Sequence, residues 1–245
     1  MKEKVKSDEK AFRQVVTKLV SKHLKPGDRV FEPGLCQELG MSRTPVRQAL
    51  ARLLEAGILV RIPHQKGYVV PELSMEDMRQ IFSTRIIIEG ECAFFAAEAI
   101  KEPELQFLRD LNEQEEECFF SGDRHAYAQI NETFHFYLYE ICRNPYLKKF
   151  ATHLYWRSQL YTFHMGFFYS SDFIKVRIKK LKESGHVSYM EHRCVIDELE
   201  KRSPIEARNA MNAHIRRTYE HYEQAKVIDL YGAGQTFVSG GKEGI

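Results

Sequence analysis

The stretch SRTPVRQALARLLEAG, residues 42–57, decides the fold of the first part of this 245-residue chain. Ser42 is a favourable helix N-cap, and Pro45 falls in the first turn, where its missing N–H costs nothing. Gly57 then stops the helix. The apolar residues between them recur at helical spacing and are Val46, Ala49, Leu50, Leu53 and Leu54.

The segments around this helix predict a winged helix-turn-helix. One helix is expected over residues 8–24, and a short one over 34–39 is closed by Gly40, directly before residues 42–57. Two β-prone runs, 58–62 and 68–70, are joined by a turn over 64–67 and predict a basic hairpin, the wing. Arg43 and Arg47 share a face near the start of the third helix, where arginine forks can read guanine. A solvated basic face is the alternative for two such arginines.

The distribution of charge supports a nucleic-acid partner for the first part of the chain. Residues 1–72 hold 14 Lys and Arg and 8 Asp and Glu, a net charge of +6, whereas the rest holds 22 and 26, a net charge of −4. The five scattered cysteines form no CxxC pair, which argues against a disulfide framework and a zinc ribbon. Without a long apolar run or an apolar segment near residue 1, we expect a cytoplasmic protein with no membrane partner.

From Pro71 onward the pattern predicts helices only. They are expected over residues 75–100, 103–121, 124–142, 145–168, 171–201 and 204–225, with Ser74 and Ser203 as N-caps and an interruption of the segment 171–201 near Ser184 and Gly185. The expected fold class is therefore mainly α. It comprises a winged helix-turn-helix domain over 1–72, an all-helical domain over 73–228, and a flexible tail over 229–245.

Three histidines of the predicted helical body are candidates for a shared metal. Asn131 and His135 lie four residues apart on one helix, and His192 and His214 lie on two later ones. Facing helices of a bundle can bring such side chains together, and imidazole suits zinc, nickel, copper or iron. The chain has ten histidines, however, and a hydrogen-bonded core or a solvated position is the alternative for each.

Residues 26–70 resemble the winged helix-turn-helix of the GntR family of bacterial transcription regulators. The resemblance rests on the SRTPVRxALxxLxxxG core over 42–57 and the KGxxV pattern from Lys66. The second helix departs from the family pattern Glu-Arg-Glu-Leu, because residues 32–35 read Glu-Pro-Gly-Leu and an expected phosphate-contacting arginine is absent. The residues that the resemblance and the spacing place on DNA are Ser42, Arg43, Thr44, Arg47, His64, Lys66 and Gly67.

The body resembles the FCD domain of the FadR subfamily of these regulators. His135 and His192 match its histidine positions, and Ala207, Met211 and His214 match its pattern A-x-x-x-M-x-x-H. In many members an aspartate completes the set, and here Asn131 stands in its place. The resemblance implies a divalent metal, zinc first and nickel or iron as alternatives, with Asn131 as a weak ligand or a neighbour of the ligands. A metal-free polar pocket stays open.

A metal held by neutral ligands would attract a small carboxylate effector. Arg85 is a candidate clamp for its carboxylate, or else a salt-bridge partner of Glu89. Trp156, Tyr161 and His164 are candidates to line the pocket, or else core. We therefore expect a regulator that binds a pseudo-palindromic operator as a homodimer under control of a carboxylate, and not an enzyme, because no HExxH or GxSxG motif is present. A metal-dependent enzyme with a DNA-binding appendage and a constitutive DNA-binding dimer are the alternatives.

Overall fold

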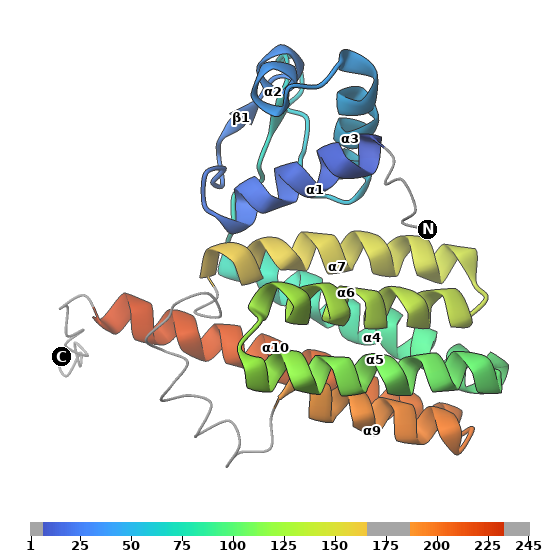
Figure 1. Cartoon of the computed structure of the whole chain (residues 1–245). Helices are drawn as coiled ribbons and strands as arrows, with labels where there is room; N and C mark the ends of the chain where they lie inside the picture. The colour runs from blue at the N-terminus through green and yellow to red at the C-terminus, as the bar shows by residue number, and fades with distance from the viewer. Residues whose placement is uncertain (1–6, 166–186, 233–245) are drawn as a thin grey trace, which may run out of the picture.

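A computed structural model describes residues 7–165 and 187–232, which form nine helices and two short strands (Figure 1). The N-terminal module, residues 7–70, contains α1 (Ser7–Val20), β1 (Arg29–Val30), α2 (Glu32–Leu39), α3 (Arg43–Glu55) and β2 (Tyr68–Val69). The helical body contains α4 (Met75–Ala99), α5 (Glu102–Ser121), α6 (Arg124–Ile141), α7 (Pro145–Met165), α9 (Ser188–Glu200) and α10 (Pro204–Gly232). The mainly α fold with a small sheet is as predicted.

The turn between α2 and α3 has the geometry of a helix-turn-helix. Gly40 adopts the left-handed conformation with a φ of 60°, and its N–H and that of Met41 bond back to carbonyls of α2. The predicted boundaries of α3 are confirmed, and its buried face holds Val46, Ala49, Leu50 and Leu53. The α2 helix begins two residues earlier than predicted, because a proline in the first helical turn gives up no hydrogen bond.

The wing differs from the hairpin that the sequence predicts. β2 pairs antiparallel with β1, in the register Arg29 with Val69 and Val30 with Tyr68. The predicted partner run, residues 58–62, contributes one isolated bridge, between Val60 and Val69. The main partner of β2 is therefore β1, in the segment before α2. With only two residues, β1 is too short to show the alternation that identifies a strand in the sequence.

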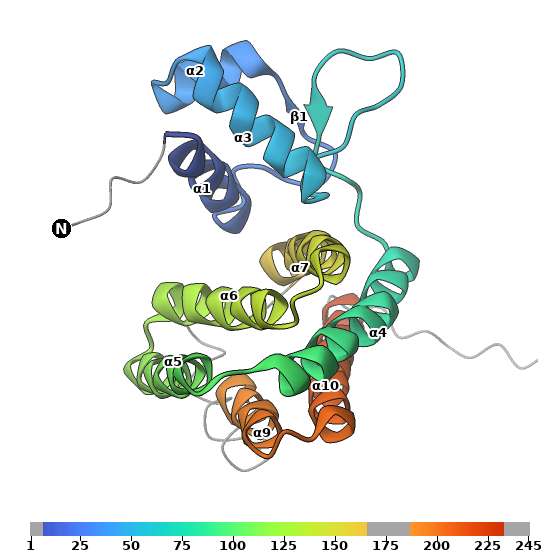
Figure 2. The same cartoon turned by 90° about the vertical axis from the view of Figure 1, so that its right-hand side faces the viewer.

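α4 is the central helix of the body. Its start is capped as predicted, because the Asp77 N–H donates to the Ser74 hydroxyl at 3.1 Å. Figure 2 shows α4 between α7 and α10, with α5 and α6 side by side. The apolar core of the body draws residues from α4, α5, α6, α7, α9 and α10. None of the described helices is long and apolar enough to cross a membrane.

The N-terminal module and the body share one apolar core through α7. Tyr155, Trp156, Leu160 and Phe163 of α7 are buried in the same cluster as residues of α1 and α3. Figures 1 and 2 show α1 lying over α6 and α7. A change in α6 or α7 can therefore reach the helix-turn-helix through packed side chains.

Two expectations for the C-terminal part are revised or left open. The segment predicted to be helical over 171–201 is described only from residue 187 onward, where it forms α9. Its first part lies within 166–186, outside the described residues. The last helix continues to Gly232, past the predicted end near 225 and into the predicted tail. The remainder of that tail, 233–245, lies outside the described residues.

Candidate functional site

The structure brings His135, His192 and His214 together inside the body. They come from α6, α9 and α10, and each is at most 3% exposed. One ligand nitrogen from each lies within 4.8 Å of the others. We call this cluster the histidine pocket. The sequence predicted the convergence, although it could not fix the distances.

Each histidine of the pocket is held by a buried glutamate. The Nδ1 atom of His135 lies 2.8 Å from Glu89 on α4, and that of His214 lies 2.8 Å from Glu191 on α9. The Nδ1 atom of His192 lies 2.7 Å from Glu115 on α5. Because carboxylate oxygens accept hydrogen bonds, Nδ1 carries the proton in each ring and Nε2 presents a lone pair.

Burial favours the neutral form of two of these rings. It lowers the pKa of His135 to about 3, although the Glu89 carboxylate acts in the opposite direction. Burial also lowers the pKa of His214, with Glu191 again opposing. Burial alone would raise the pKa of Glu89, but Arg85 and His135 hold the pKa of its carboxyl well below the ordinary value. The pocket therefore combines neutral imidazoles with an ionised carboxylate behind them.

With Nδ1 protonated and the rings neutral, His135 and His214 turn lone pairs toward each other. Their Nε2 atoms lie 3.3 Å apart, and the Nε2 of His192 is buried with no hydrogen-bond partner in the described structure. Two lone pairs at this distance repel each other, and an unpartnered buried nitrogen is costly. A bound cation would satisfy all three atoms at once. The donor set therefore fits a metal ion.

Asn131 and Arg85 lie beside the pocket. The Asn131 amide donates from Nδ2 to the Tyr155 hydroxyl at 3.2 Å, which leaves its carbonyl oxygen as the possible ligand atom. Arg85 is buried and forms an ion pair with Glu89 at 2.5 Å and a hydrogen bond to Ser158 at 2.9 Å. The salt bridge that the sequence left open for Arg85 is therefore present.

The other candidate pocket residues of α7 contact different parts of the protein. Trp156 packs edge-on against Phe12 of α1 at a ring distance of 5.2 Å. The Tyr161 hydroxyl donates to Asp77 and lies 3.0 Å from the Ser74 carbonyl, at the start of α4. His164 is half-buried, and burial together with nearby Lys22 lowers its pKa. The structure thus does not group these three side chains with the histidines.

The sequence predicted no site role for Tyr155, Glu115 or Glu191, and it named Glu89 only as a possible partner of Arg85. The ring of Tyr155 lies 5.3 Å from that of His135, and the Arg85 guanidinium lies 5.4 Å above it. Glu191 directly precedes His192 in the sequence, but its position there does not indicate that its side chain binds His214. Glu115 stands in an acidic run, EQEEE over 113–117, that is typical of a solvated helix face.

The predicted DNA-contacting residues lie at the solvent-exposed end of the module. Ser42, Arg43, Thr44 and Arg47 lie at the start of α3, where Ser42, Arg43 and Thr44 are exposed, and His64 and Lys66 are exposed in the wing. Arg47 forms a 2.8 Å ion pair with Glu32 of α2, which orients its guanidinium. Gly67 has a φ of 91°, and an added Cβ would lie 2.8 Å from the Phe31 ring, so the wing turn requires glycine.

The fold and the pocket together define a class of protein: a winged helix-turn-helix on an all-helical domain with a buried polar pocket. Comparison with models of known protein families supports this class for both parts of the chain. The model of the gntR family of bacterial regulatory proteins matches residues 8–70, and that of the FCD domain matches residues 80–217. The chain therefore belongs to the GntR family of bacterial transcription regulators and carries an FCD domain.

Individual relatives are also transcription regulators. The chain is 26% identical to the uncharacterized regulator YdhC of Bacillus subtilis over 211 residues, 86% of this chain and 88% of that one. It is 32% identical to the regulator McbR of Escherichia coli over 124 residues, 51% and 56% of the two chains. The solved structure of E. coli McbR/YncC has a TM-score of 0.72 at 22% identity and covers 91% of this chain and all of that one, so the fold is shared. The protein is a regulator and not an enzyme.

Proposed function

We propose that the histidine pocket controls operator binding by holding a divalent cation and a small carboxylate effector. Zinc is the first candidate for the cation, with nickel and iron as alternatives. The regulator would act in the cytoplasm as a homodimer on a pseudo-palindromic operator, in the manner of the FadR subfamily. The observation that carries the proposal is the convergence of three buried histidines, each with a glutamate oxygen within hydrogen-bond distance of its Nδ1 atom.

The distance between two of the three ligand atoms supports zinc. Two nitrogens bound to tetrahedral zinc at about 2.0–2.1 Å lie roughly 3.3–3.4 Å apart. The Nε2 atoms of His135 and His214 lie 3.3 Å apart. His192 would supply the third ligand, and Asn131 stands one helical turn before His135 as a weak fourth ligand. A neutral amide is easily displaced, so the effector would take that position.

The charges around the pocket favour a cation first and an anion second. Counted in their ordinary ionised forms, Glu89, Glu115 and Glu191 contribute three negative charges, and Arg85 and Arg217, which pair with Glu89 and Glu191, contribute two positive ones. One buried negative charge is left over, and burying an unpaired charge is costly. A divalent cation changes the balance to one positive charge, which a monocarboxylate would neutralise. Arg85, whose guanidinium has five donors, would bind that carboxylate beside Glu89.

An exposed apolar face on α4 and α7 supports the homodimer. Ile87 is 64% exposed and Phe95 37% on α4, while Tyr146 is 74% exposed and Phe150 57% on α7. The two helices pack antiparallel, because Cys92 lies with Ala151 while the start of α4 meets Tyr161. A second copy of the chain would cover these side chains and present two recognition helices to a symmetric operator.

Operator affinity measured with and without ligands tests the proposal. A duplex selected by the protein from random sequences is titrated in fluorescence anisotropy, first after chelation, then with zinc, then with zinc and a panel of small carboxylates. We expect zinc to bind with one equivalent per chain and at least one carboxylate to change the affinity only when zinc is present. An affinity that is the same in all three states would point to a constitutive DNA-binding dimer.

A further inference from the structure

Two pairs of consecutive residues connect the histidine pocket to the N-terminal module. On α6, Asn131 contacts the pocket side and Glu132 contacts α1. On α7, Tyr155 contacts the pocket side and Trp156 contacts α1. Both helices therefore carry a residue that meets the pocket next to one that meets the helix-turn-helix module.

The pocket side of this connection is closely packed. The Tyr155 hydroxyl accepts from Asn131 at 3.2 Å, and its ring lies 5.3 Å from that of His135. Arg85, which holds Glu89, stacks on the same ring. Any shift of His135 or Asn131 that follows ligand binding must therefore displace Tyr155 or turn α6.

The module side is held by a bidentate ion pair. Both terminal nitrogens of Arg13 donate to Glu132, at 2.6 and 2.7 Å. Glu132 is 9% exposed, whereas the Arg13 side chain is 44% exposed, so the carboxylate is buried and the guanidinium reaches it from the edge of the contact between α1 and α6. Paired arginine–carboxylate bonds fix direction as well as distance. Turning α6 would therefore move α1 with it.

The connection continues to the recognition helix. Arg13 also binds Glu9 at 2.8 Å, and Glu9 binds Arg52 of α3 at 2.7 Å. Trp156 packs against Phe12, and the Arg52 guanidinium lies 4.5 Å from the centre of the same Phe12 ring. Both routes therefore reach α3 through α1.

We propose that the Glu132–Arg13 pair transmits the state of the histidine pocket to α3, with Tyr155 and Trp156 as its packed support. Glu132 is a positioning residue: it touches neither the cation nor DNA, and it sets the orientation of the module relative to α6. The proposal rests on the proposed function, because it needs a ligand in the pocket. It predicts that removing the charge of Glu132 uncouples operator affinity from zinc while zinc binding persists.

The test uses the full-length protein with zinc as the only added ligand. Operator affinity is measured with and without zinc for the wild type and Glu132→Gln, and zinc content and melting temperature are measured for both. We expect the wild type to change its affinity by about 5–150-fold on zinc binding and the variant by less than about 2-fold. Glu132→Gln should still bind one zinc and unfold cooperatively, and Arg13→Gln should show the same loss of coupling.

Glu55→Gln is the matched control. It removes the same charge from another ion pair between the module and the body, Glu55 with Lys149 at 3.9 Å, in which both side chains are 68% exposed. It should keep the wild-type response to zinc. A wild-type response in folded Glu132→Gln overturns the transmission proposal alone. A wild type that binds no zinc overturns the proposed function and the transmission proposal with it. A wild type that binds zinc without a change in operator affinity overturns the transmission proposal alone, because the proposed function assigns that change to zinc together with a carboxylate.

Discussion

At the scale of single residues, the pocket depends on three glutamates that would touch no ligand. Each fixes the tautomer and direction of one histidine, and each is buried. The sequence predicts the histidines, because i, i+4 spacing and a family pattern can be read from one chain. It does not predict the glutamates, since their pairing joins α4 to α6, α5 to α9, and α9 to α10, which depends on helix packing alone.

Glu115→Gln should weaken the metal site without removing a ligand. An amide can accept from the His192 Nδ1–H but lacks the charge that makes Nε2 a stronger donor. We expect zinc affinity to fall by about 10–100-fold at unchanged stoichiometry, measured by competition with a chromogenic chelator.

The neighbouring variant Glu116→Gln serves as the control. Glu116 pairs with Arg193 at the surface instead of with a histidine. Its zinc affinity should equal that of the wild type. If both variants lost zinc affinity equally, the effect would come from a change in α5 as a whole and not from the loss of the contact between Glu115 and His192.

At the scale of elements, the sequence determined helix ends better than strand partners. Ser74 and Gly40 act locally, so their helix boundaries could be predicted. The strand that pairs with β2 could not be predicted. Its partner β1 has only two residues, and the tertiary fold brings the two strands together. Trp156, Tyr161 and His164 lie in an aromatic-rich stretch whose pattern does not show which side of α7 faces the pocket and which faces the module.

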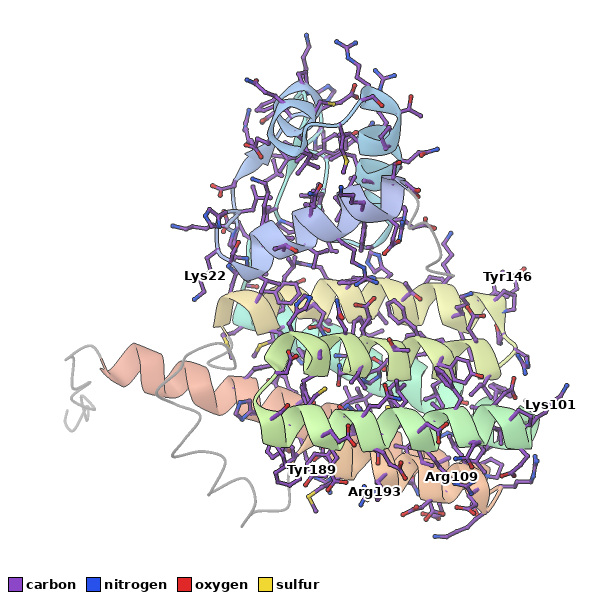
Figure 3. The ribbon with its side chains drawn as sticks, in the orientation of Figure 1. Lys22, Lys101, Arg109, Tyr146, Tyr189 and Arg193 are labelled. Carbon is purple, nitrogen blue, oxygen red and sulfur yellow. The ribbon has the colours of Figure 1, made fainter. Side chains whose placement is uncertain are left out.

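The start of α3 should carry sequence-specific recognition. Arg43→Ala and Arg47→Ala should each weaken binding of the selected duplex by about 5–150-fold, the effect of losing one base contact worth about 1–3 kcal/mol. Metal content should stay unchanged. Arg109→Ala is the control, since Arg109 lies on α5 on the part of the body away from α3 (Figure 3). Operator binding that survives both α3 changes would show that another surface meets the bases.

The wing turn should tolerate no side chain at Gly67. Alanine there would need a positive φ and would meet Phe31, so Gly67→Ala should cost about 1–3 kcal/mol and lower the melting temperature. Gly34→Ala, in α2 with open space around it, should instead leave stability equal or raise it by up to about 1 kcal/mol. Thermal denaturation followed by circular dichroism compares the two, and an unchanged melting temperature for Gly67→Ala would show that the turn accommodates a side chain after all.

At the scale of the whole molecule, the module and the body form one packed unit through α7. The shared core on one side of α7 and the exposed apolar face on another suggest two roles for it: one in coupling and one in assembly. Tyr146 lies at the outer end of α7 in Figure 3, away from the module. The two roles therefore use different surfaces and can be separated by mutation.

Charges placed on the exposed apolar face should break the dimer. Ile87→Asp and Phe150→Asp each put a carboxylate where we propose an interface core, and burying it unpaired is costly. We expect the molar mass from light scattering to fall from two chains to one, with operator affinity reduced. Met190→Asp on α9, also an exposed apolar position, should remain a dimer. If the wild type is already monomeric in solution, α4 and α7 do not form the interface.

The central claim is that three glutamate-oriented histidines bind a metal, and metal analysis tests it most directly. Untagged protein purified without chelator is analysed for zinc, nickel and iron, beside His135→Ala prepared in parallel. We predict about one equivalent of metal per chain in the wild type and a loss of that metal in the variant. Metal-free wild type that also takes up none on dialysis against zinc would contradict the account and leave a metal-free polar pocket.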